Sequence, residues 1–293
     1  MFYKESLGRR IFVICNYFFC SLMAIVCILP MLHIFAISLS DNTAVNAGLV
    51  KLIPVNFTLA SYEYILGEAK FFRAMLISVS RVALGIAFGM LMTVLAAYPL
   101  SKTKRQFAAR QIYVWYFMVA MMISGGLIPN YLLISGLGLV DNILALVLPT
   151  AVNVFNIILL QNYIKSLPEE IMESAFVDGA GHFKVLFKIV LPLCKPVLAT
   201  LVLFIAVAHW NSWFDGLIYM NHVENYPLQS YLQTIVVDID MDLVQNVDDL
   251  LLNVTQKSSK SAQIFLAMLP ILCVYPFLQK YFTSGIVMGS VKG

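Results

Sequence analysis

The sequence predicts an all-α membrane protein with six transmembrane helices, on three observations. Hydrophobic residues occupy 60% of the 293 positions and charged residues only 12%, whereas soluble domains carry roughly 25% charged residues. Several apolar runs are long enough to cross a bilayer. Lysine and arginine are concentrated in every second segment between those runs, as they are in multi-pass membrane proteins. Lipid is therefore expected to cover much of the protein surface.

The six predicted spans follow the apolar runs. The first run follows three basic residues, as in a signal peptide. It is far longer than the roughly 7–15 apolar residues of a signal peptide, so it is predicted to be a retained span. The fourth run is the least distinct, because Asn153 and Asn156 interrupt it. The spans comprise residues 11–38, 74–100, 112–134, 142–163, 196–220 and 263–283.

The basic residues predict how these spans are oriented. Thirteen of the 19 lysines and arginines lie in segments on the side of the N-terminus, five lie on the other side, and Arg81 lies within the second span. Cytoplasmic loops are enriched in basic residues, so both termini are predicted to be cytoplasmic. Residues 164–195, between the fourth and fifth spans, are then cytoplasmic as well.

Two outer segments are long enough to have structure. Residues 39–73 contain FTLASYEYIL, which predicts a short surface helix, and residues 221–262 are acidic. Asp238, Asp240 and Asp242 have the spacing of a calcium loop, but the turn glycine and the closing glutamate are absent. A solvated acidic loop is therefore predicted. The five cysteines show no metal or disulfide spacing and are predicted to be small apolar residues, so no metal site is expected.

The cytoplasmic segment begins with helix-start signals. Ser166 and Glu169 have the spacing of a capping box, and Pro168 is tolerated in a first helical turn. The predicted helix runs to about Val177. The sequence Asp178-Gly179-Ala180-Gly181 then predicts a break, and Asp178 is able to cap the next helix.

A second short helix is predicted after the break. Phe183, Leu186, Phe187 and Val190 recur at helical spacing, and Pro192 and Pro196 are predicted to end the helix and lead into the fifth span. Two interpretations of this helix–bend–helix segment are open on physical grounds. It is either a knob that fits the groove of a cytoplasmic partner or an amphipathic loop that lies on lipid headgroups.

The segment resembles the EAA loop of permease subunits of ATP-binding-cassette importers. That pattern is Glu-Ala-Ala, three residues, Gly, nine residues, Ile, one residue and Leu-Pro. This chain has Glu173-Ser174-Ala175, Gly179, Ile189 and Leu191-Pro192 at those spacings. Ser174 is the single departure, and it replaces one small residue by another.

The rest of the chain resembles the carbohydrate-uptake branch of these importers, in particular the partner-type permease of maltose-like systems. The similar stretches are LAAYPLSK, WNSWFDGLIYM, YPLQ and the tail YPFLQKYFTSGIVMGSVKG. The resemblance covers roughly residues 60–293. It implies a type I ABC importer permease fold, with an N-terminal helix and outer segment in residues 1–60. Residues 61–293 would form the transmembrane domain, with a coupling loop at about 164–195.

The resemblance also implies a set of partners. A second permease subunit, two ABC ATPase subunits and an extracytoplasmic sugar-binding protein would assemble with this chain in the bacterial plasma (inner) membrane. The chain has no G-x-x-x-x-G-K-[ST] motif, so ATP and Mg would be bound by the ATPase subunits. The chain itself is expected to be neither an enzyme nor a cofactor protein.

Roles for the loop residues come from the resemblance. Glu173, Ala175 and Gly179 would seat the loop in an ATPase cleft. Phe183, Leu186 and Phe187 would hold the loop against the spans, and Asp178 would either cap a helix or contact a basic ATPase residue. The full set assigned to ATPase coupling is Glu173, Ser174, Ala175, Asp178, Gly179, Gly181, Phe183, Leu186, Phe187, Ile189, Leu191 and Pro192.

A sugar pathway is predicted from aromatic and hydrogen-bonding residues near the spans. The candidates are Arg81, Asn153, Asn156, His209, Trp210, Asn211, Trp213 and Asp215. An alternative stays open, in which the tryptophans form an interfacial belt and the asparagines join helices. Arg81 either faces protein or water, or extends to the interface. Gly85 and Gly89 form a G-x-x-x-G pattern that allows close helix approach.

Other functional classes are less well supported. An ion-coupled secondary carrier of a small solute usually has titratable groups deep in its spans. None of the 16 acidic residues is predicted to lie deep in a span, and Asp215 comes closest. A membrane enzyme would need a nucleophile and base or a metal site. The tail and the YPLQ stretch look most like permeases for larger glycans, so oligosaccharides or polysaccharide fragments are the expected substrates.

Overall fold

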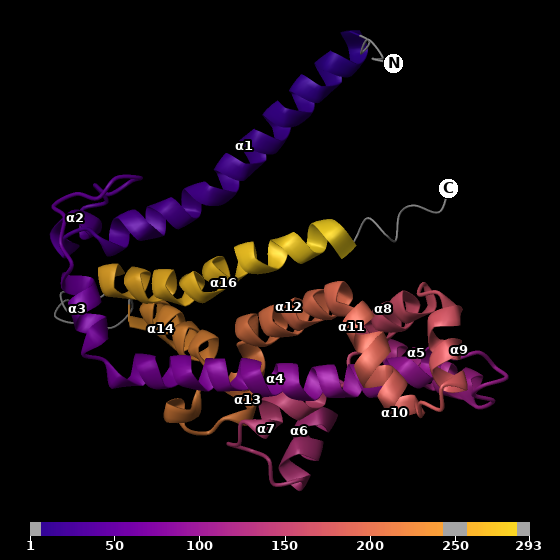
Figure 1. The fold of residues 1–293 in the computed structure, drawn as a ribbon. Coiled ribbons are helices and arrows are strands. Elements are labelled where there is room, and N and C mark those ends of the chain that lie inside the picture. The colour runs from indigo at the N-terminus through magenta and orange to yellow at the C-terminus, as the bar shows by residue number, and fades with distance from the viewer. Residues whose placement is uncertain (1–6, 243–256, 286–293) are drawn as a thin grey trace. The chain divides into compact units, whose positions relative to one another are not determined.

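The computed structural model describes residues 7–242 and 257–285 of the chain (Figure 1). These residues are helical or irregular, and the β-structure among them is an isolated bridge between Ser40 and Phe57. The chain divides into two compact units. One comprises residues 1–71 with 234–269, and the other comprises residues 72–233 with 270–293. The units join distant segments and do not correspond to the predicted domains 1–60 and 61–293, whose boundary stays a prediction.

The first unit contains α1 (Leu7–Ser38), α2 (Asn42–Asn46) and α3 (Ala60–Leu66), with parts of α14 (Leu228–Asp242) and α16 (Lys257–Gly285). Helix α1 buries only its last residues, Ala36 and Ser38, so its apolar length is left for lipid or another subunit. Helix α3 lies where a short surface helix was predicted, and that prediction is confirmed.

The second unit carries most of the chain. Its helices are α4 (Ala69–Ser101), which begins just before the unit, α5 (Arg110–Met122), α6 (Leu127–Gly136), α7 (Leu144–Val147) with the 3₁₀ turn η1 (Leu148–Thr150), α8 (Val154–Lys165), α9 (Glu169–Val177), α10 (His182–Val185), the π-helical turn η2 (Leu186–Val190), α11 (Leu191–Leu193), α12 (Lys195–Asn211), α13 (Phe214–Tyr219) and the turn η3 (Val223–Asn225).

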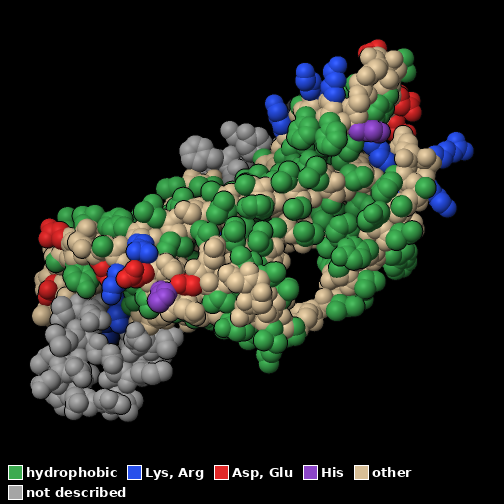
Figure 2. Space-filling view, turned by 90° about the horizontal axis from the view of Figure 1, so that it is seen from below, with side chains coloured by type: hydrophobic (Ala, Val, Ile, Leu, Met, Phe, Trp, Pro, Cys, Tyr) green, Lys and Arg blue, Asp and Glu red, His purple; other side chains and the backbone are tan. Residues whose placement is uncertain are grey.

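Helices α1 and α4 are each long and apolar enough to cross a membrane, and up to five spans result if three bent helix pairs each count as one. Exposed hydrophobic side chains cover much of the face in Figure 2, as a lipid-facing protein requires. The count of six spans and the cytoplasmic position of both termini stay predictions.

Three predicted spans are interrupted, which corrects the sequence interpretation. The run 142–163 is broken by a bend of 50° between Leu144–Thr150 and Val154–Lys165. The run 112–134 is broken between α5 and α6 by a bend of 113°, where Gly126 adopts φ +78°. The run 196–220 ends at Asn211, and a separate short helix, α13, follows it. Apolar composition does not show such breaks, because apolar residues predominate on both sides of each break.

The core of the second unit packs the end of α4 against α8 and the segment after α9. Its buried members include Ala97 and Tyr98 of α4, Leu160 of α8, Val185 of α10 and Leu201 of α12. These contacts fix the segment 169–193 to the end of α4, and this arrangement positions the candidate site.

Helices α4 and α12 approach closely where glycines were predicted to allow it. A side chain at Gly85 would overlap the ring of His209, whose Cγ would lie 2.8 Å from the added Cβ. At Gly89 the added Cβ would lie 3.1 Å from Cδ1 of Ile205. The predicted role of the G-x-x-x-G pattern in helix packing is confirmed.

The predicted acidic loop at 221–262 is partly helical. Residues 228–242 form α14, so the backbone at Asp238, Asp240 and Asp242 is helical and not a calcium loop. Asp248 and Asp249 lie outside the described residues. Among residues 7–242 and 257–285, no group of three His, Cys, Asp or Glu side chains could hold a metal ion.

Candidate functional site

Residues 169–193 form a bent helical segment, which we call the elbow. Its first arm, α9, spans Glu169–Val177, as predicted. The predicted capping box is wrong. The N-cap residue is Pro168, which makes no side-chain cap, and the Ser166 hydroxyl instead donates to the Tyr163 carbonyl at 2.7 Å.

The bend of the elbow depends on Gly179. The Gly179 N–H donates to the Phe176 carbonyl at 3.0 Å, and the Ala180 N–H donates to the Ala175 carbonyl at 2.9 Å. These two bonds form a Schellman motif, which needs a left-handed residue at the position of Gly179, and its φ is +77°. Asp178 does not cap the next helix, because α10 starts from Gly181 without a side-chain cap.

The elbow buries one face and exposes another. Ala175, Val185, Leu186 and Val190 are buried in the core, and Ile189 and Leu191 are half-buried. The other loop residues assigned to coupling are exposed, namely Glu173, Ser174, Asp178, Gly179, Gly181, Phe183, Phe187 and Pro192.

The predicted packing of Phe183 and Phe187 against the spans is wrong. Their exposed fractions are 72% and 54%, and Val177 is 87% exposed. Val185, Leu186 and Val190 take the packing role instead. The π-helical turn 186–190 changes the residue spacing, so a period of 3.6 residues assigns the wrong side chains to the buried face.

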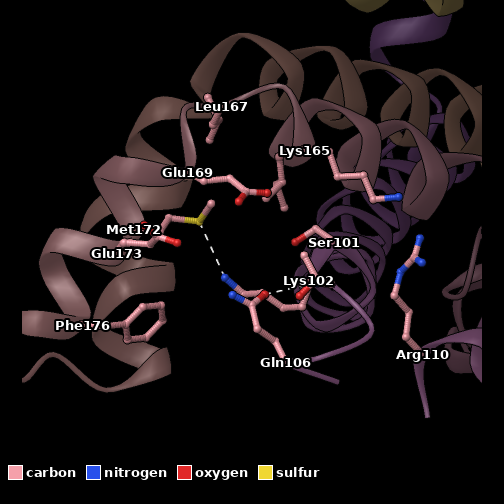
Figure 3. A pocket seen from close by; sticks show the side chains of 12 residues that line it. Ser101, Lys102, Gln106, Arg110, Lys165, Leu167, Glu169, Met172, Glu173 and Phe176 are labelled. Carbon is pink, nitrogen blue, oxygen red and sulfur yellow. Dashed lines mark hydrogen bonds between the residues drawn. The ribbon is translucent and has the colours of Figure 1, made fainter. Parts of the chain in front are cut away.

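A cavity of about 310 Å³ separates α9 from the turn that follows α4 (Figure 3). Lys102, Arg110 and Lys165 bring positive charge to its wall, and Glu169 and Glu173 bring negative charge. The remaining wall is formed by Ser101, Thr103, Gln106, Ile164, Leu167, Met172 and Phe176.

Lys102 is only 8% exposed. Its ammonium group lies 3.6 Å from the Met172 sulfur, 4.4 Å from the ring centroid of Tyr98 and 5.6 Å from that of Phe176. Burial lowers the pKa of Lys102, and the carboxylate of Glu169 opposes this shift. Sequence reasoning missed this contact, although Tyr98 in the last turn of α4 and Lys102, the residue after that helix, are only four positions apart.

Arg81 and Asp215, two of the predicted pathway residues, form a buried ion pair. One Arg81 nitrogen also donates to the Ser212 carbonyl at 3.2 Å, and Nε donates to Nδ1 of His209 at 3.4 Å. Asp215 accepts the Ser212 hydroxyl at 2.8 Å and the Gly216 N–H at 3.0 Å. Arg81 therefore faces protein and does not extend to the interface.

The other predicted pathway residues do not form one site, because they differ in burial and in the residues they contact. Trp210 is buried, whereas Asn211 and Trp213 are exposed. Asn153 accepts the Asn156 N–H at 3.2 Å and caps α8, and Asn156 is buried. Asn153 thus has a structural role within its own helix.

Comparison with known proteins identifies the family. The family model described as "Binding-protein-dependent transport system inner membrane component" matches residues 2–288. The chain is 40% identical over 286 residues to protein LplC of Bacillus subtilis, which covers 97% of this chain and 96% of LplC. It is 37% identical to the polygalacturonan/rhamnogalacturonan transport system permease protein YtcP of the same organism, which covers 97% of this chain and 99% of YtcP.

Solved structures show the same fold. The chain matches the crystal structure of a bacterial ABC transporter involved in the import of the acidic polysaccharide alginate, with a TM-score of 0.86, 32% identity and coverage of 96% of this chain and 100% of that one. It also matches, in fold, a bacterial alginate ABC transporter in complex with an alginate pentasaccharide-bound periplasmic protein. That match has a TM-score of 0.57 and 17% identity, and covers 94% of this chain and 96% of that one. The chain therefore belongs to the family of binding-protein-dependent transport system inner membrane components.

Proposed function

We propose that this chain is one of two permease subunits that together form the pathway of an ATP-driven importer in the bacterial plasma membrane. Two ABC ATPase subunits drive the pathway from the cytoplasm, each through one elbow. An extracytoplasmic binding protein delivers the substrate. Family membership supports the delivery step, because the family is described by its dependence on a binding protein.

The exposed apolar face of the elbow is the observation that best supports the proposed contact with an ATPase. Val177, Phe183 and Phe187 extend from a segment that also bears acids and lysines. Clustered apolar side chains on such a segment mark a contact surface for another protein. The chain has no nucleotide-binding motif of its own. An ATPase is therefore the partner that supplies both the missing contact and the missing energy.

The substrate is proposed to be an oligosaccharide or a polysaccharide fragment. The names of two relatives support this class, because YtcP is named for polygalacturonan and rhamnogalacturonan, and the solved transporter imports alginate. Asn211 and Trp213 are exposed near the end of α12, and Asn153 is exposed at the start of α8, so these three predicted pathway residues are accessible to a sugar. Arg81, His209, Trp210 and Asn156 are buried and are proposed to support the pathway rather than to touch the sugar.

An ion-coupled secondary transporter is the alternative. The buried group of Arg81, His209 and Asp215 favours it, because ionisable side chains within spans often form ion or proton paths. The dependence of the family on a binding protein opposes it.

The experiment that tests the proposal is uptake by proteoliposomes that contain the complete complex. The binding protein is loaded with a polygalacturonan-derived oligosaccharide, with a neutral maltodextrin as the comparison substrate. Uptake should persist when ionophores remove all ion gradients and should stop when ATP is withheld. Uptake that follows the ion gradients and ignores ATP would establish the secondary transporter instead.

A further inference from the structure

We propose that Lys102 is a positioning residue that couples the elbow to α4, so that movement of the elbow under the ATPases reaches the N-terminal half of that helix. This inference rests on the proposed function. It adds a specific mechanical link inside the chain, formed by Tyr98 and Lys102 on one side and by Met172, Phe176 and His182 on the other. We call these five residues the cage.

The cage joins the end of α4 to both arms of the elbow. The ammonium group of Lys102 contacts Met172 and Phe176 of α9. The Tyr98 hydroxyl lies 3.4 Å from Nδ1 of His182 in α10. The rings of Phe176 and His182 meet edge to face, with centroids 5.0 Å apart. Any displacement of α9 or α10 therefore acts on the same two side chains of the α4 end.

A buried ammonium is a costly way to fill this space, which argues that its charge has a use. A leucine or methionine would pack without the loss of hydration that a lysine suffers. Among the described residues, no carboxylate oxygen lies within 4.0 Å of the Lys102 nitrogen. The rings of Tyr98 and Phe176 lie against the charge and stabilise it, in addition to the more distant carboxylate of Glu169. Such cation–ring contacts are strong when desolvated.

The N-terminal half of α4 is joined to the segment 212–228 by hydrogen bonds and an ion pair. Arg81 binds the Ser212 carbonyl and Asp215, and the Ser78 hydroxyl accepts the Leu228 N–H at 2.7 Å. Arg81 and Tyr98 are 17 positions apart, which corresponds to about 25 Å along a helix. One continuous helix thus connects the elbow with the polar segment that follows α12.

The cavity beside the cage leaves space for this movement. It lies between α9 and the turn after α4, and its walls include Lys102, Met172 and Phe176 of the cage (Figure 3). A tilt of α9 towards the turn after α4 would enter this open space, while Ala175 on the other face stays packed in the core. Glu169 lies on the same wall and is the carboxylate that a tilt could bring to Lys102.

The test is Lys102→Met in the complete complex, which keeps an unbranched side chain only one atom shorter and removes its charge. Assembly with the ATPases and ATP hydrolysis should stay within twofold of wild type, whereas the ATP consumed per sugar imported should rise about tenfold, within the usual range of coupling between sites. Lys102→Arg should restore most of the coupling. Lys104→Met is the matched control, because Lys104 is exposed two positions away, and it should behave as wild type.

If Lys102→Met consumes the same amount of ATP per sugar imported as wild type, the role of Lys102 is wrong, but the proposed importer function still stands. Absence of ATP-dependent uptake by the wild-type complex would instead overturn the proposed function, so the two failures are distinguishable. If Lys102→Met does not assemble, Phe176→Leu decides, since it keeps an apolar side chain and removes one ring of the cage. That variant should raise the ATP-to-sugar ratio as well, and an unchanged ratio would contradict the role of the cage.

Discussion

The guanidinium of Arg81 in α4 donates to both carboxylate oxygens of Asp215 in the first turn of α13, one of them at 3.1 Å. The Arg81 side chain is 1% exposed and that of Asp215 is 22% exposed. The pair links two segments 134 positions apart in the sequence. Because the charge of Arg81 is buried, Asp215 is the group that makes its position tolerable.

Asp215→Asn should destabilise the protein strongly, because it leaves the Arg81 charge without its partner. Loss of one member of a buried pair costs about 3–5 kcal/mol, and the partial exposure of Asp215 favours the lower value. The temperature at which the detergent-solubilised complex loses monodispersity measures this effect. The double variant Arg81→Met with Asp215→Asn removes both charges and should recover most of the lost stability. A double variant that is less stable than Asp215→Asn would show that the pair does not act as a unit.

Gly85→Ala should weaken the contact between α4 and α12, because the new methyl group overlaps the His209 ring. Overpacking of this kind costs about 1–3 kcal/mol, which the same thermal measurement detects. Gly89→Ala is the control, since its neighbour is the flexible end of Ile205, and it should be close to neutral. Combining Gly85→Ala with His209→Ala should relieve the overlap. Equal stability of Gly85→Ala and Gly89→Ala would contradict the close approach of α4 to α12 at Gly85.

The elbow was the part of the site that sequence reasoning predicted best. The boundaries of α9 and the break at Gly179 follow from local chemistry, namely a proline near the helix start and a glycine at its end. The capping box failed because Ser166 belongs to the end of the preceding helix, where its hydroxyl bonds to Tyr163. The exposure of Phe183 and Phe187 could not be predicted, because the π-helical turn leaves no signal in the hydrophobic spacing.

Contacts between residues far apart in the chain could not be predicted from a single sequence. Arg81 and Asp215 were both named as candidates, but nothing in their positions pairs them across 134 residues. The break between α5 and α6 had one local signal, the adjacent glycines at 125 and 126, which the apolar character of the run concealed. Tyr98 and Lys102 of the cage lie within the LAAYPLSK stretch, but the other three members come from α9 and α10, which the sequence does not place beside it.

Gly179→Ala should impair docking of the ATPase while the chain still folds. Its Cβ would meet no atom within 4 Å, so the effect comes only from the left-handed backbone, which costs a non-glycine residue about 1–2 kcal/mol. In the free variant the elbow can leave the left-handed conformation and so lose its native bend. Binding to the ATPase would have to impose that bend again at the cost of the strain, so the affinity for the ATPase should fall about tenfold. Co-purification at limiting ATPase concentration measures the change.

Gly181→Ala is the matched control for that variant. Gly181 has φ −76°, an angle that alanine adopts readily, and an added Cβ would also meet no atom within 4 Å. It should bind the ATPase as wild type does. Equal losses in the two variants would mean that glycine is needed at the elbow for a reason other than the turn.

Site-specific photo-crosslinking from position 183 tests the central claim most directly. Phe183 is replaced by a photoreactive phenylalanine analogue in the complete complex, and the adducts are identified by mass spectrometry. A second probe at Tyr116, which is 66% exposed on α5, serves as the control and should not capture an ATPase. The account predicts that the probe at 183 captures the ATPase subunit. Adducts at 183 with lipid alone, in a complex that contains the ATPase, would contradict it.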